Sequence, residues 1–115
     1  MKTLKLIDDL YCPIYYSNSK KDLNKIYDKK NKDDLEQIEL CNNYAGVCIY
    51  NSNIRTVYVF VFDSKLNTLV HELFHTMLRV NLSIGSSICE ENEEFNAYYM
   101  QKLFQKIVNI DKTLT

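Results

Sequence analysis

The chain has 115 residues, of which 46% are hydrophobic and 25% are charged, a composition typical of one soluble domain with an ordinary core. Fourteen basic and fifteen acidic residues give a net charge of -1, and the basic residues form no stripe that would track phosphates. Nucleic acid is therefore not an expected partner. No apolar run approaches the length of a membrane span, which argues against a membrane partner as well.

The first residues predict no secretory signal peptide, because two aspartates, Asp8 and Asp9, occur before any sufficiently long apolar stretch. We therefore expect a protein that is made inside the cell and located in the cytoplasm, or in the virion if a phage encodes it. The four cysteines contain no CxxC pair, which argues against a zinc ribbon or a thioredoxin-like site. We expect them to be buried free thiols.

The N-terminal half predicts short strands followed by a helix. The apolar stretch 4–16 is interrupted by two aspartates and a proline, which favours one or two short strands with a turn. Asn18 or Ser19 is a candidate N-cap of the following helix, which we expect to fray in the charge run 29–34. The mixed signs of that run favour a solvated surface segment over a binding patch. Residues 35–43 fit either a short helix or an irregular connection.

The middle of the chain predicts a β-hairpin. The runs 45–50 and 55–62 are rich in β-branched and aromatic residues, and the polar cluster 51–53 between them has the length of a hairpin turn. In the second run valines alternate with aromatic residues, so both faces of this strand are apolar. We expect both faces to be at least partly covered.

The next segment predicts a helix that runs to about Val80, with Asp63 or Ser64 as its N-cap. Apolar residues occupy most of its circumference, so we expect this helix to lie in the core. They are Leu66, Leu69, Val70, Leu73, Phe74, Met77 and Leu78.

A loop at 81–87 contains Gly85, a natural helix stop, and a final amphipathic helix is expected from about Glu90 to Ile110. Its expected buried stripe consists of Phe95, Tyr99, Leu103 and Ile107. Together these elements predict an α+β fold in which a small, mostly antiparallel sheet of three or four strands packs on helices. We expect residues 1–115 to form a single domain.

The two histidines of the chain, His71 and His75, flank Glu72 in the pattern HExxH. Random placement of the same residues would give this arrangement about once in a thousand sequences. Histidines at positions i and i+4 project from one helix face, close enough to share a metal ion, and the glutamate leans toward the same side. The motif therefore predicts a site for one Zn²⁺ ion. Without a metal, Glu72 in an otherwise apolar helix would be hard to bury.

A third ligand must come from outside the motif, since catalytic zinc usually takes three protein ligands and leaves a fourth position for water. The chain has no third histidine, so a carboxylate or a thiolate is needed. Cys89 and the acidic run 90–94 follow downstream. The acidic run also favours a helix N-terminus through the helix dipole, whether or not it binds a metal.

At this point the sequence resembles the gluzincin metallopeptidases, in which a glutamate from a following helix, set in an Asn-Glu-x-x-Ala type of motif, joins HExxH. Glu94 lies 19 residues after His75, with Ala97 three positions further, a spacing similar to that of this group. The resemblance implies Glu94 as the third zinc ligand, with Glu93 as the next candidate. The order of elements over roughly residues 55–105 also resembles the minimal gluzincins and small phage-encoded HExxH proteins.

Tyr98 is a departure from the resemblance, because many gluzincins carry an aspartate four residues beyond the ligand glutamate that orients a histidine. A tyrosine hydroxyl could make that bond or face the substrate oxyanion, although Tyr98 and Tyr99 are more typical of packing residues. By resemblance, the strand 55–62 would be the edge on which an extended peptide lies. Its two apolar faces fit a central strand equally well.

The resemblance implies a zinc metalloendopeptidase that acts on a peptide or protein substrate, with Glu72 as general base and acid. The alternative is a catalytically inactive, zinc-stabilised binding or structural protein, for example a phage component. The presence of Glu72 favours the enzyme, because a purely structural site has no use for it. The small size of the chain allows only a shallow cleft, which favours the alternative or a substrate shaped by a partner.

Overall fold

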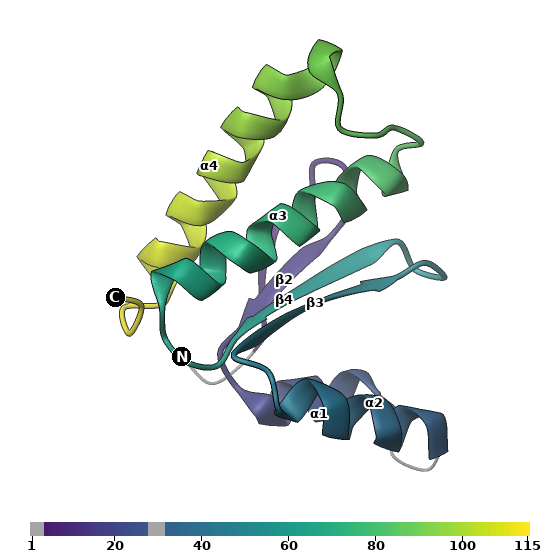
Figure 1. Ribbon diagram of the computed structural model, residues 1–115, viewed down its shortest axis with the longest axis vertical. Coiled ribbons are helices and arrows are strands. Elements are labelled where there is room, and N and C mark those ends of the chain that lie inside the picture. The colour runs from purple at the N-terminus through teal and green to yellow at the C-terminus, as the bar shows by residue number, and fades with distance from the viewer. Residues whose placement is uncertain (1–3, 28–31) are drawn as a thin grey trace.

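The sheet forms from two separate parts of the chain, as the computed structural model shows over residues 4–27 and 32–115 (Figure 1). Its four strands within these ranges have the order β1-β2-β4-β3. They are β1 (Lys5–Asp8), β2 (Ile14–Ser17), β3 (Gly46–Asn51) and β4 (Thr56–Val61). Two of the three neighbouring pairs are antiparallel, and β2 with β4 is parallel. The predicted α+β class is confirmed.

The parallel pairing of β2 with β4 requires the chain to cross from one end of the sheet to the other. The crossover contains α1 (Lys20–Ile26), α2 (Lys32–Asn42) and β3. The predicted cap of α1 is confirmed, because the Ser19 hydroxyl accepts a hydrogen bond from the Lys21 amide. Residues 35–43 belong largely to helix α2, and part of the charge run 29–34 lies outside the described residues.

Helices cover both faces of the sheet (Figure 1). The long helices α3 (Leu66–Ser83) and α4 (Glu93–Ile110), with the short 3₁₀ turn η1 (Glu90–Asn92) before α4, lie on one face, and α1 and α2 lie on the other. The alternation predicted for 55–62 explains this arrangement, since the valines of β4 pack under α3 and α4 while Phe60 packs with Leu23 and Cys41. Strand β4 is thus buried on both faces.

Helix α3 lies in the core along one side only, which corrects the prediction of a helix that is buried nearly all round. Leu69, Leu73 and Val80 are fully buried against the sheet. Val70, Phe74 and Leu78 on the outer side are 46%, 50% and 44% exposed. The N-cap is Lys65 instead of Asp63 or Ser64, although the Asp63 carboxylate accepts hydrogen bonds from the Lys65 amide and the Thr68 hydroxyl.

Two further sequence predictions are confirmed only in part. All four cysteines are free thiols, but only Cys12 and Cys41 are buried, while Cys48 is half-buried and Cys89 is exposed. In α4 the expected stripe is fully buried at Tyr99, Leu103 and Ile107, and Phe95 packs at its margin. Among the described residues, no helix is both long and apolar enough to cross a membrane.

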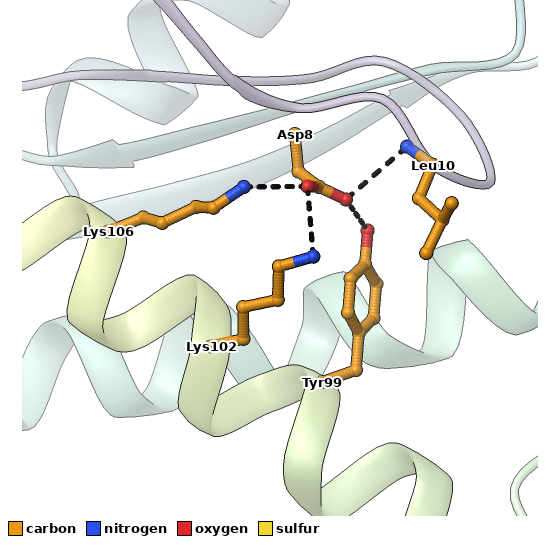
Figure 2. Close-up of polar contacts among 5 residues, drawn as sticks. All are labelled: Asp8, Leu10, Tyr99, Lys102 and Lys106. Atoms are coloured by element: carbon orange, nitrogen blue, oxygen red, sulfur yellow. Dashed lines mark hydrogen bonds and ion pairs between the residues drawn. The ribbon is translucent and has the colours of Figure 1, made fainter.

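A buried aspartate ties the β1–β2 connection to α4 (Figure 2). The carboxylate of Asp8 accepts hydrogen bonds from the Tyr99 hydroxyl, the Leu10 amide and, at 2.8 Å, the Lys106 ammonium. Lys102 forms a second ion pair with it at 3.5 Å. Burial alone would raise the pKa of Asp8, but these hydrogen bonds and the charge of Lys106 outweigh it and lower the pKa to about 2.

Replacement of Asp8 by asparagine is expected to destabilise the protein at pH 7 by about 2 kcal/mol, the free energy that corresponds to a pKa lowered by roughly two units. The folded pKa lies below the unfolded value, so this stability is fully present above about pH 4 and is lost as the pH falls toward 2. Urea unfolding at pH 7 and at several values between pH 4 and pH 2 measures both effects. The exposed Asp9→Asn serves as control, and equal acid sensitivity of both variants and the wild type would contradict the assignment.

Candidate metal centre

His71 and His75 lie one turn apart on α3 and project from the same side of the helix. Their Nε2 atoms are 3.3 Å apart, and both side chains are exposed. Two nitrogen ligands of a tetrahedral zinc ion, each about 2.0–2.1 Å from the metal, lie about 3.3 Å from one another. The two imidazoles therefore already have the separation that a shared zinc ion requires.

Glu72 joins the histidines in a group of side chains whose potential ligand atoms all lie within 4.8 Å of one another. In contrast to the histidines it is buried, with an exposed fraction of 6%. Burial raises the pKa of Glu72, and the smaller influence of His71 opposes this rise. None of the ion pairs among the described residues involves its carboxyl group. Glu72 is thus a carboxylate held beside the histidines without a charged partner of its own.

A cleft runs between β3 and α3, and we call it the β3–α3 cleft. It consists of two adjoining hollows of about 340 and 250 Å³, both of which are lined by His71 and Glu72. The first also contains Asn67 and Thr68, and the second contains His75 and Arg79. The remaining lining residues come from the start of β3 and the residues before it, namely Tyr44, Ala45, Gly46, Val47 and Cys48. The candidate metal ligands and Glu72 therefore face one continuous depression.

Gly46 permits the close approach of β3 to α3 on which this cleft depends. A Cβ atom at this position would lie 2.7 Å from the Phe60 carbonyl oxygen, 2.7 Å from Cγ2 of Thr68 and 3.1 Å from Cγ of Glu72. The first of these contacts is with backbone, which cannot give way as a side-chain end can. A larger residue here must shift β3 against the Phe60 carbonyl of β4, and it must also move the Thr68 and Glu72 side chains of α3.

The free strand edge beside the site belongs to β3, which corrects the assignment of 55–62 as the edge for a bound peptide. Strand β4 pairs with β3 on one side and with β2 on the other, so it has no free edge. The parallel pair brings residues 14–17 next to 57–60, a contact between distant parts of the chain that local pattern does not reveal. Within residues 4–27 and 32–115, β3 pairs with β4 alone, and it borders the cleft.

The structure does not bring Glu94 into the group formed by the HExxH residues. Glu94 and Glu93 are exposed in the first turn of α4. Within the described part of the chain, the only group of three potential ligands within reach of one ion is that of His71, Glu72 and His75. The assignment of Glu94 as third ligand therefore remains a prediction.

The other residues considered near the acidic run also lie apart from the histidines. Cys89 is exposed at the start of η1 and is absent from the ligand group among the described residues. Tyr99 is a packing residue, as expected, with its hydroxyl bonded to Asp8. Tyr98 is 68% exposed, so it is not the packing residue that the sequence favoured.

Three asparagines that sequence reasoning did not single out connect the two long helices. The Asn81 side chain donates to the Met77 carbonyl and, at 2.6 Å, to Oδ1 of Asn96. Asn96 in turn donates to Asn92, whose side chain also holds the loop carbonyl of Ser87 at 2.8 Å. The only signal in the sequence is their recurrence in apolar helices, where buried amides need partners. This asparagine bridge fixes the start of α4 against the end of α3.

Comparisons with models of known protein families, with curated proteins and with solved structures find no match to this chain. The functional interpretation therefore depends on the residues of the site and on their geometry.

A Gly46→Ala substitution is expected to lower the free energy of unfolding by about 1–3 kcal/mol, because the added methyl group overpacks the contact between β3, β4 and α3. Urea unfolding of the variant and the wild type measures this difference. Ser52→Ala in the exposed hairpin turn is the control and is expected to stay within about 0.5 kcal/mol of the wild type. A Gly46 variant as stable as the wild type would show that β3 does not pack on α3 as closely as described.

Proposed function

We propose that the chain is a zinc-dependent metallopeptidase that hydrolyses peptide bonds in a peptide or protein substrate. The observation that carries the proposal is the 3.3 Å separation of the two Nε2 atoms beside a buried glutamate in the β3–α3 cleft. A structural zinc site normally closes all four positions with cysteine or histidine and has no use for a buried carboxylate. The resemblance of the motif and the acidic helix to gluzincins supports the same function.

The roles of the residues follow from their positions. Zinc, when bound, supplies a Lewis acid that polarises a carbonyl group and lowers the pKa of a water molecule to about 7. His71 and His75 would hold the ion through their Nε2 atoms, which lie 3.3 Å apart. Glu72 accepts the proton of the attacking water and delivers it to the leaving amine. Its burial in the cleft wall, without a charged partner among the described ion pairs, leaves the carboxylate available for this transfer.

The substrate would lie along the free edge of β3. Pairing of an extended peptide with a strand edge positions the scissile bond through backbone hydrogen bonds, without reading side chains. Gly46 and Cys48 of this strand line the same cleft as Glu72. A peptide on this edge therefore passes directly over the general base.

For the third zinc ligand we propose Glu94, because its spacing from His75 resembles that of the gluzincins. Glu93 is the alternative, and its angular position around the axis of α4 favours it. Asn96 faces α3, because it bonds to Asn81. At about 100° per residue, Glu94 is about 160° from Asn96 around the helix and Glu93 is about 60° from it. A smaller rotation of the first turn thus turns Glu93 toward α3, whereas Glu94 needs the asparagine bridge to rearrange.

A second candidate function is a zinc-stabilised binding protein without turnover. One observation favours it: within the described residues, no third ligand beyond Glu72 lies near the two histidines. If Glu72 itself bound the ion, no general base would remain. Cleavage assays with the wild type and with Glu72→Gln distinguish this function from the peptidase.

The free thiols support a reducing compartment. All four cysteines are unpaired, and two of them are buried. Unpaired cysteines are typical of proteins that work in the cytoplasm. We therefore propose that the protein acts in the cytoplasm of the cell in which it is made.

Glu72→Gln is expected to retain zinc and to lower the rate of cleavage of an unstructured protein by about 100-fold or more, because it removes the proton acceptor but neither histidine. Metal content after dialysis and the initial cleavage rate measure the two properties. His71→Ala is the companion variant and is expected to lose both. Wild-type protein that takes up no zinc would refute the metal site, and equal cleavage by wild type and Glu72→Gln would refute the assigned base.

Glu94→Ala and Glu93→Ala, made separately, identify the third ligand. The variant that removes the ligand is expected to bind zinc more than about 100-fold more weakly, a larger loss than that of a residue that merely orients a ligand. Competition with a chromophoric chelator measures the affinity, and the exposed Glu90→Ala is the matched control. Unchanged affinity in both variants would show that neither Glu93 nor Glu94 binds the ion.

A further inference from the structure

Arg79 lies in the β3–α3 cleft one helical turn beyond His75, and it has no role in the proposed peptidase mechanism. At about 100° per residue, Arg79 and Glu72 differ by only about 20° around α3, so both side chains leave the helix toward β3. The positive charge of Arg79 also acts on Cys48 in the middle of β3. Burial raises the pKa of this thiol, the hydrogen bond with Thr76 opposes the rise, and the charge of Arg79 opposes it to a smaller extent. Arg79 lines the cleft together with Val47 and Cys48, so its side chain lies beside the strand edge.

The guanidinium of Arg79 has no carboxylate partner among the described residues. Arg55, the other arginine, already has a partner within the chain, because its side chain donates a hydrogen bond to the Ser83 carbonyl at 2.6 Å. Glu72 is the single carboxylate that lines the cleft in the described part of the chain, and none of the ion pairs there joins it to Arg79. Arg79 and Glu72 thus share the cleft without forming a pair.

The position of Arg79 on α3 sets its distance from the candidate ligand His75 and from the proposed general base Glu72. It lies about 6 Å along the helix axis from His75 and about 10 Å from Glu72, at 1.5 Å per residue. An extended peptide advances about 3.3 Å per residue. A group bound by Arg79 is therefore two or three residues away from the scissile bond of a peptide on β3.

We propose that Arg79 forms a carboxylate-binding subsite, which makes the protein selective for peptides that carry a carboxylate two or three residues from the bond it cleaves. Guanidinium groups bind carboxylates through two parallel hydrogen bonds, and the fixed fork of donors gives this contact its geometry. The carboxylate belongs either to an aspartate or glutamate side chain or to the chain terminus of the peptide. This inference rests on the proposed peptidase function.

The experiment uses zinc-loaded protein and a set of fluorogenic peptides with Asp, Asn or Lys at each position from three before to three after the scissile bond. Each peptide is made with a free and with an amidated C-terminus, which separates the two sources of the carboxylate. At one position, kcat/KM is expected to be about 10-fold higher for the Asp peptide than for the Asn peptide. The difference is expected mainly in KM, because the contact is made equally in the ground state and in the transition state. High salt reduces this Asp/Asn ratio.

In Arg79→Gln the preference for the carboxylate is expected to disappear, and Arg79→Lys is expected to restore part of it. In Arg79→Glu the preference moves from Asp to Lys at the same position. Lys112→Gln, an exposed charge change at the C-terminal end, is the matched control and leaves the ratio as in the wild type. A wild-type ratio near 1 at every position and at both termini, or a ratio unaffected by Arg79→Gln, overturns the inference.

A binding measurement separates failure of this inference from failure of the peptidase proposal. Zinc-loaded Glu72→Gln and its double variant with Arg79→Gln are titrated with the same peptides, and fluorescence anisotropy reports the affinity. Tighter binding of the Asp peptides that depends on Arg79 supports the subsite even if the wild type cleaves nothing. Equal binding of the Asp and Asn peptides overturns it, whatever the wild type cleaves.

Discussion

The contact between β3 and α3 at Gly46 determines where each group of the candidate site lies. Leu69, Leu73 and Val80 fix one side of α3 on the sheet, and this sets the rotation of the helix. At 100° per residue, Glu72 then faces β3, while His71 and His75 line the exposed side of the cleft. A larger residue than glycine would crowd the helix, because its Cβ atom would lie 2.7 Å from Cγ2 of Thr68 and 3.1 Å from Cγ of Glu72, both on α3. The cleft exists because this one position has no side chain.

Polar contacts hold helix α4 on two sides. These contacts determine how far a glutamate of its first turn, the proposed third zinc ligand, can move toward the histidines. Tyr99 bonds to Asp8 on the β1 side, and Asn96 bonds to Asn81 on α3. Residues 93 and 99 lie on opposite flanks of Asn96, each about 60° from it. The flank that carries Glu93 therefore points away from β1. The asparagine bridge thus limits how far the first turn of α4 can move toward the histidines. Glu94 could reach them only if that bridge rearranged, whereas Glu93 would need a smaller rotation of the turn.

The sequence predicted the helices and strands whose apolar residues alternate or recur at helical spacing. The hairpin, the motif helix and the final helix appear where valine and aromatic alternation or helical spacing placed them, and Ser19 caps α1 as expected. Two features were wrong because they depend on contacts between distant residues. The pairing of β2 with β4 makes β4 central, and only this pairing shows that β3 is the free edge. Phe74 and Leu78 are exposed because the sheet and α4 cover only part of α3, which hydrophobicity alone does not show.

In the proposed peptidase, recognition and chemistry would occupy different parts of α3. His71, His75, Arg79 and Glu72 lie within about 100° of one another around this helix, with the two candidate metal ligands at one limit and the two groups that face β3 at the other. A peptide on the edge of β3 would be held by backbone hydrogen bonds that are the same for every sequence. Selectivity must then come from the few side chains that line the cleft. Arg79 is the one arginine or lysine among them, and it has no carboxylate partner among the described ion pairs. In the proposed peptidase, the rotation of α3 that would position Glu72 over the scissile bond would therefore also position the charge that we propose selects the substrate.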